Sequence, residues 1–171
     1  MTEIKIRVNG QTRIVHAEPE TPLIYVLRND LGFKAAKLGC GLEQCGACKV
    51  LINGEALPSC RVPVSMVQDC DIVTLEGLAT SNVTHAVQQA FIDEQAVQCG
   101  YCTPGVIVAA VALLTRYPAP TDAQIYEALE RNLCRCGAYT RILRAVHRAA
   151  DMVAKDSPYD SADESTNETA Q

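Results

Sequence analysis

The chain has 171 residues, of which 48% are hydrophobic and nine are cysteines, and its formal net charge is −5. This length allows one domain or two small ones, and no stretch approaches the roughly 20 consecutive apolar residues of a membrane span. The N-terminus alternates apolar and charged residues without an apolar signal core, so we expect a cytoplasmic protein whose cysteines serve metal or redox chemistry rather than disulfides.

The first half of the chain is predicted to form short strands and turns around one helix. Residues 4–8 alternate apolar and charged side chains, and Asn9-Gly10 favours a type I′ turn before a returning strand over residues 12–16. Thr21-Pro22 predicts an N-cap followed by proline at the first helical position, with an apolar face of Leu23, Val26, Leu27 and Leu31. A second hairpin is predicted around Asn53-Gly54, and a further strand over residues 72–75.

The second half is predicted to be helical, with a boundary near residues 76–83. A first helix is expected over residues 84–97, with Val87, Ala90, Phe91 and Val97 on its apolar face. Thr103-Pro104 begins a helix that is apolar nearly all round to about Arg116, so it should be central and buried. A capping box at residues 121–124 precedes a helix over 125–133, and Thr140 precedes a last helix that carries Ile142, Val146, Ala149 and Val153. Four helices with short connections indicate a bundle.

The net charge lies entirely in the C-terminal end. Residues 1–150 contain 14 basic and 14 acidic side chains, whereas residues 151–171 contain one lysine and six acidic residues. From Ser157 onward the chain is poor in large apolar groups, so we expect residues 154–171 to form an acidic, disordered tail. A neutral body without a basic stripe argues against nucleic-acid binding.

Eight of the nine cysteines fall into two sets. The first set follows the pattern C-x4-C-x2-C within a glycine-rich loop, with a later fourth member: Cys40, Cys45, Cys48 and Cys60. This arrangement is that of plant-type ferredoxins and favours a 2Fe–2S cluster over zinc, because Gly39, Gly41 and Gly46 let backbone N–H groups approach the sulfurs.

The second set combines a C-x2-C with a C-x-C motif: Cys99, Cys102, Cys134 and Cys136. C-x2-C also occurs in zinc sites, so zinc stays open here. Cys102 lies just before Pro104, where the N-terminus of the central helix favours anionic thiolates, and this position favours a second 2Fe–2S cluster. Cys70 is left over as a small buried hydrophobe, and His16, His85 and His147 have no partner spacing.

At these two cysteine sets the sequence resembles the small iron–sulfur subunit of the xanthine oxidase family of molybdenum hydroxylases. The motifs are G-C-G-L-E-Q-C-G-A-C, Q-C-G-Y-C-T-P-G and N-L-C-R-C-G, and the similarity covers about residues 3–152. Further similarity, in L-R-N-D-L-G, A-V-Q-Q-A-F-I-D-E-Q-A-V-Q-C-G-Y-C and I-L-R-A-V-H-R-A-A, is to small subunits of nicotinate and isoquinoline dehydrogenases.

The resemblance implies an α+β protein with a β-grasp, plant-type ferredoxin-like domain (residues 1–76) followed by an all-α four-helix bundle (residues 77–153). It implies two 2Fe–2S clusters, with molybdopterin, expected in its cytosine dinucleotide form, on a separate large subunit. Gln98 would then hydrogen-bond the pterin, and Cys136 would be the cluster ligand nearest to it.

The function implied is electron transfer from that subunit to an external acceptor, with an N-heteroaromatic substrate expected before an aldehyde. No flavin-binding segment or C-x-x-C-H motif is visible, so the final acceptor is expected to be another subunit or a diffusible protein. The resemblance to nicotinate and isoquinoline dehydrogenases implies a cytochrome c or quinone-linked acceptor rather than a flavin subunit. Two alternatives are a free-standing two-cluster carrier and a zinc-stabilised interaction protein.

The acidic tail yields a first prediction. Truncation after Ala154 removes a segment that is not expected to bury itself, so iron content and complex assembly should be unchanged. Iron analysis and size-exclusion chromatography of the truncated protein test this, and loss of assembly would contradict the disordered-tail interpretation.

Overall fold

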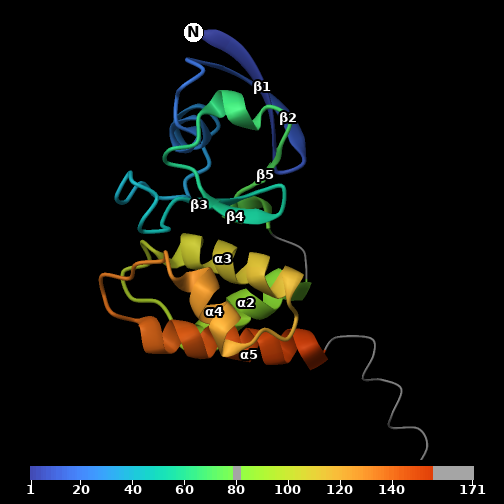
Figure 1. Cartoon of the computed structure of the whole chain (residues 1–171), viewed down its shortest axis with the longest axis vertical. Coiled ribbons are helices and arrows are strands. Elements are labelled where there is room, and N and C mark those ends of the chain that lie inside the picture. The colour runs from blue at the N-terminus through green and yellow to red at the C-terminus, as the bar shows by residue number, and fades with distance from the viewer. Residues whose placement is uncertain (79–81, 156–171) are drawn as a thin grey trace, which may run out of the picture.

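The computed structural model describes residues 1–78 and 82–155, which form a sheet-containing half and a helical half (Figure 1). The sheet has the order β2-β1-β5-β3-β4. Its strands are β1 (Thr2–Val8), β2 (Gln11–Ala17), β3 (Lys49–Ile52), β4 (Glu55–Pro58) and β5 (Asp71–Val73). β1 pairs in parallel with β5, and the other neighbours pair antiparallel, so the sheet is mixed. This sheet and the helices after it confirm an α+β protein, with a ferredoxin-like part followed by a helical part.

Both predicted hairpin turns are confirmed. Asn9 and Gly10 have φ angles of 52° and 75°, and Asn53 and Gly54 have φ angles of 51° and 85°. Two successive residues with positive φ define a type I′ turn, whose twist matches that of the flanking strands. The first turn connects β1 to β2, and the second connects β3 to β4.

The helix predicted after Thr21 is shorter than expected and begins later. α1 spans Leu23–Tyr25 and continues as a π-helical turn over Val26–Asp30. Leu23, Val26 and Leu27 are fully buried against the sheet, as predicted. The predicted N-cap is wrong: Pro22 is extended (ψ 134°) and occupies the cap position, because it forms a β-bridge with Pro63 while the Thr21 carbonyl accepts the Val64 N–H.

In the described part of the second half, α2 (Asn82–Asp93), α3 (Thr103–Arg116), α4 (Asp122–Leu129) and α5 (Tyr139–Lys155) pack around one core. α3 is buried over most of its length, as its apolar sequence predicts. The capping box at α4 is confirmed, because Thr121 and Gln124 exchange side-chain to backbone hydrogen bonds.

Three predicted helix ends are wrong. α2 ends at Asp93, Gln95 has a φ of 49°, and Val97 therefore lies outside the helix with 42% of its surface exposed. α4 ends at Leu129, so Leu133 is not helical and its N–H donates to the Cys45 carbonyl instead. Thr140 lies inside α5, which begins at Tyr139.

The domain boundary predicted after residue 76 falls in the short 3₁₀ turn Leu75–Gly77, between the sheet and α2, and it stays a prediction. α5 extends to Lys155, two residues beyond the predicted end of the helical domain. The tail from 156 onward lies outside the described residues. Within residues 1–78 and 82–155, no helix is long and apolar enough to cross a membrane.

The two halves meet where the cysteine loop lies on the N-terminus of α3. A Cβ added to Gly105 would clash with the Gly46 carbonyl, and one added to Gly46 would clash with the Arg131 carbonyl and the Asn132 amide. α3 also packs against β3 and β4, which lie directly above it in Figure 1. The loop before β3 is therefore fixed against the helical half by backbone contact.

This contact yields a second prediction, which compares Gly46→Ala with Gly32→Ala. The two glycines have φ angles of 70° and 77°, so each substitution incurs about 1 kcal/mol of left-handed backbone strain. A methyl group at position 46 meets other atoms, whereas one at position 32 has nothing within 4 Å among residues 1–78 and 82–155. We expect Gly46→Ala to lower the free energy of unfolding by about 1–3 kcal/mol more than Gly32→Ala, measured by chemical denaturation. Equal losses would contradict the close packing at Gly46.

Candidate metal centres

The first cysteine set lies on the loop before β3 and on the turn after β4. Cys48 immediately precedes β3 and Cys60 follows β4, so the hairpin brings these two distant cysteines together. Both side chains are buried beside Ile24. Ser59 stabilises the pair, because its N–H and hydroxyl both donate to the Cys48 carbonyl oxygen, at 3.2 and 2.7 Å.

Backbone N–H groups point at the sulfurs of the exposed part of this loop. The N–H groups of Leu42 and Gln44 each lie 3.3 Å from Cys40 Sγ, and the Cys40 N–H lies 3.3 Å from Cys45 Sγ. Gly41 allows this reversal with a φ of 66°. Although burial raises the pKa of Cys40, these N–H donors lower it to about 7, so the loop favours a thiolate at this position.

The second set comes from two loops that meet at the N-terminus of α3. Cys99 and Cys102 lie on the segment that precedes the helix, with Cys102 at its N-cap position. Cys134 and Cys136 lie between α4 and α5. The Ala138 N–H lies 3.4 Å from Cys134 Sγ, and the Tyr139 hydroxyl accepts the Cys134 N–H at 2.9 Å. The helix terminus and these contacts favour an anionic sulfur site.

Within each set the thiols are hydrogen-bonded two by two. The pairs are Cys40 with Cys45, Cys48 with Cys60, Cys99 with Cys136 and Cys102 with Cys134. In the described residues, no group of three or more His, Cys, Asp or Glu side chains is arranged to hold a metal ion. Pairing suits a two-iron core, because each iron takes two of the four protein ligands.

Burial disfavours ionisation of one thiol in each set. Desolvation, together with the neighbouring Cys60 thiol, raises the pKa of Cys48 to about 12. Desolvation and Cys134 likewise raise the pKa of Cys102 to about 11. Such thiols ionise at neutral pH only near a strong positive charge, which a bound metal supplies.

Members of both sets line one cavity of about 530 Å³. Its lining includes Cys45 of the first set and three members of the second: Cys99, Cys102 and Cys134. The Leu133 N–H, one residue before Cys134, donates to the Cys45 carbonyl at 2.9 Å. The two sets are therefore joined by a direct hydrogen bond between their loops.

The other residues singled out from the sequence lie apart from these thiols. Gln98 is exposed beside Cys99, where a second chain could contact it. Cys70 is partly buried and packs against the sheet core, as predicted. The His147 ring lies 3.7 Å from the Asp122 carboxylate at the surface.

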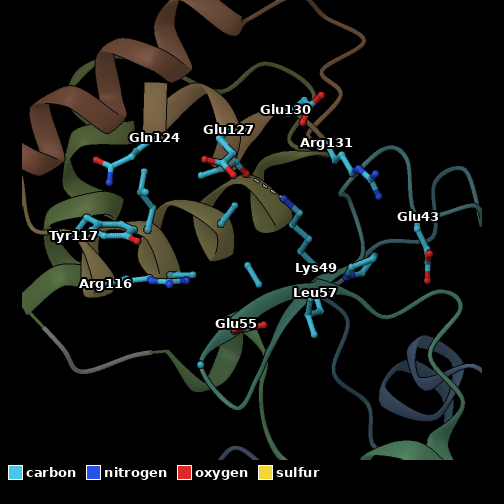
Figure 2. Close-up of a pocket in the computed structure, with 17 residues that line it drawn as sticks. Glu43, Lys49, Glu55, Leu57, Arg116, Tyr117, Gln124, Glu127, Glu130 and Arg131 are labelled. Carbon is cyan, nitrogen blue, oxygen red and sulfur yellow. Dashed lines mark hydrogen bonds between the residues drawn. The ribbon is translucent and has the colours of Figure 1, made fainter. Parts of the chain in front are cut away.

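Two buried polar residues between the halves, Lys49 and Asn132, were not predicted from the sequence. Their side chains are 8% and 5% exposed, and Lys49 Nζ donates to Asn132 Oδ1 at 2.6 Å. Burial, together with repulsion from Arg131, lowers the pKa of Lys49 to about 8. The neighbouring Cys48 has the opposite effect and raises it. Lys49 lies on a cavity of about 700 Å³ between the β3–β4 hairpin and helices α3 and α4, shown in Figure 2. The one sequence signal was a charged side chain at the start of an otherwise apolar strand.

The residues present fit two 2Fe–2S clusters. Each half of the chain supplies four thiols from two segments, and backbone N–H groups already point at Cys40, Cys45 and Cys134. Gly39 leaves space for the Cys45 sulfur, because a Cβ at Gly39 would lie 2.6 Å from it. Thiolate ligands and N–H···S hydrogen bonds are what iron–sulfur clusters require.

Comparison with known families agrees with this donor set. Residues 6–72 match a family model described as "2Fe-2S iron-sulfur cluster binding domain". Residues 74–147 match a second model, described as "[2Fe-2S] binding domain". Each half of the chain therefore matches one cluster-binding family.

Two curated relatives match over nearly their whole length. A nicotinate dehydrogenase subunit from Pseudomonas putida is 55% identical over 150 residues, which are 88% of this chain and 96% of that protein. The alpha subunit of isoquinoline 1-oxidoreductase from Brevundimonas diminuta is 49% identical over 152 residues, which are 88% of this chain and 99% of that protein. Among solved structures, a chain of quinoline 2-oxidoreductase from Pseudomonas putida 86 superposes with a TM-score of 0.82 at 33% identity, covering 91% of this chain and 97% of that one.

Proposed function

Because the chain belongs to the iron–sulfur small subunits of the xanthine oxidase family of molybdenum hydroxylases, we propose that it carries electrons from a substrate-oxidising large subunit to an acceptor. The observation that carries this function is that Cys45 of the first set, in one half, lines the same cavity as Cys99, Cys102 and Cys134 of the second set, in the other half. When bound, the two clusters supply one-electron redox chemistry. The chain itself supplies ligands, hydrogen bonds and a water-excluding fold.

The first cluster is assigned to Cys40, Cys45, Cys48 and Cys60, and the second to Cys99, Cys102, Cys134 and Cys136. The hydrogen-bonded thiol pairs support one iron on each pair. Cys48, Cys60 and Cys134 are buried and Cys102 is partly buried, so these two pairs keep water away from one side of each cluster. The pairs that contain Cys40 and Cys99 lie nearer the surface. Residues 1–76 and 77–153 are the corresponding domains, the first a β-grasp and the second a four-helix bundle.

Electrons enter this chain at the second set and leave at the first. Gln98 and Cys99 are exposed, and Cys136 is half-buried beside them, so this face is accessible to the pterin of a large subunit. Gln98 would hydrogen-bond that pterin, and Cys136 would be the nearest ligand. The exposed Cys40 loop then faces the acceptor. The hydrogen bond from the Leu133 N–H to the Cys45 carbonyl holds the loops of the two sets next to each other.

The relatives support an N-heteroaromatic substrate, because their names give nicotinate, isoquinoline and quinoline as compounds on which they act. The large subunit would hold molybdopterin in its cytosine dinucleotide form. A cytochrome c or a quinone-linked protein is the proposed acceptor.

A third prediction tests the function through the partner. When this chain is affinity-purified from its native host, a large molybdenum-containing subunit should co-purify, and the preparation should contain about four iron and four sulfide per chain. The complex should reduce a dye with N-heteroaromatic carboxylates or bases, and more slowly with aldehydes. A chain that elutes alone would indicate a free carrier, and zinc without iron would exclude both functions.

A fourth prediction concerns Cys136 and uses Cys70 as its control. Cys136→Ser should remove or shift one of two EPR signals and abolish at least about nine-tenths of acceptor reduction, because the cluster that first receives the electron loses a ligand. Cys70→Ser changes a cysteine outside both sets and should leave both signals and turnover intact. Unchanged signals in Cys136→Ser would contradict the ligand assignment.

A further inference from the structure

Lys49 is a buried cation that has no anionic side chain as a partner in the described part of the chain. Its ammonium donates to Asn132 Oδ1 at 2.6 Å. It also donates to the Ala128 carbonyl at 3.3 Å, the bond drawn as a dashed line in Figure 2. Glu55, Glu127 and Glu130 line the same cavity, yet Lys49 forms no ion pair within 4.0 Å among residues 1–78 and 82–155. A buried charge that is met only by neutral acceptors is costly unless another charge nearby compensates it.

The first cysteine set lies one residue away from Lys49 along the chain. Lys49 directly follows Cys48 in the chain, and the two side chains interact electrostatically. Four thiolates and two sulfides around two ferric ions leave a net negative charge, and reduction adds one more. The charge that Lys49 lacks among its side-chain neighbours is therefore supplied by the cluster that the adjacent cysteine would hold.

Asn132 fixes this cation and has a second polar group directed at the same loop. Its Oδ1 accepts the Lys49 hydrogen bond, while its buried Nδ2 has no partner among the described residues. That Nδ2 would lie 2.7 Å from a Cβ added to Gly46, so it faces the backbone between Cys45 and Cys48. Asn132 itself is two residues before Cys134. The Lys49–Asn132 pair thus links the loops of both cysteine sets.

We propose that Lys49 is the buried counter-cation of the first 2Fe–2S cluster and raises its reduction potential, with Asn132 as the residue that positions it. The proposal rests on the proposed function, because it uses the ligand assignment above. One electron arrives from the second cluster, reduces one ferric ion of the first to ferrous, and later leaves to the acceptor. The Lys49 ammonium would stabilise the added negative charge.

The fifth prediction is a shift in midpoint potential, measured by EPR-monitored redox titration of the assembled complex. Lys49→Met removes the charge at similar volume and should lower the midpoint of the first cluster, while the midpoint of the second moves much less. Lys49→Arg keeps the charge and should stay closer to the unsubstituted protein. Lys5→Met, which removes an exposed lysine from β1, is the matched control and should shift neither cluster.

The outcomes separate this proposal from the proposed function. If the unsubstituted complex shows no 2Fe–2S signals, the function fails and the proposal fails with it. If both signals titrate and Lys49→Met leaves the first midpoint unchanged, only the role of Lys49 is wrong. An equal shift of both clusters, or a shift in Lys49→Arg as large as in Lys49→Met, would assign the effect to packing and overturn the electrostatic role. If Lys49→Met does not assemble, Lys49→Gln, which keeps a hydrogen-bond donor without the charge, provides the same measurement.

Discussion

The rest of the structure depends on one backbone contact, in which Gly46 lies against Gly105 at the start of α3 and against the Arg131–Asn132 segment. Gly46 lies between Cys45 and Cys48, and Gly105 follows Cys102 by three residues. Three of the segments that carry candidate ligands are therefore fixed within a few residues of this point. Side chains at either glycine would separate the two halves, so the distance between the cysteine sets is set by main-chain atoms, which vary little.

Local rules explain why much of the fold was predictable. A type I′ turn needs two residues that accept positive φ, and Asn-Gly supplies them at both hairpins. The capping box of α4 and the proline that starts α3 are likewise decided within four residues. The predicted helix ends were wrong where contacts with residues distant in sequence determine the local structure. Pro22 became part of a β-bridge with Pro63 instead of a first helical turn, and α4 stops short because the Leu133 N–H pairs with Cys45.

The spacing of the cysteines predicts which of them form one ligand set, but it does not predict how the two sets are placed relative to each other. Both sets were predicted from the sequence, whereas the presence of Cys45 and Cys134 on one cavity follows from the packing of α3 under β3 and β4. Lys49 illustrates the limit most clearly. A half-exposed strand would place a lysine in solvent, but β3 is buried at all four residues because the helical half covers its second face. Periodicity within a strand does not reveal a neighbour that is contributed by another domain.

The charges of the molecule are arranged so that each cysteine set has its own source of positive potential. The N-terminus of α3 lies next to Cys102 of the second set, and Lys49 directly follows Cys48 of the first. A helix terminus carries roughly half an elementary charge, whereas an ammonium carries a full one and is held in a less polar place. On the ligand assignment proposed here, the stronger source lies next to the cluster that receives the electron last within this chain. On this proposal, that order favours electron flow from the face containing Gln98 toward the face containing Cys40.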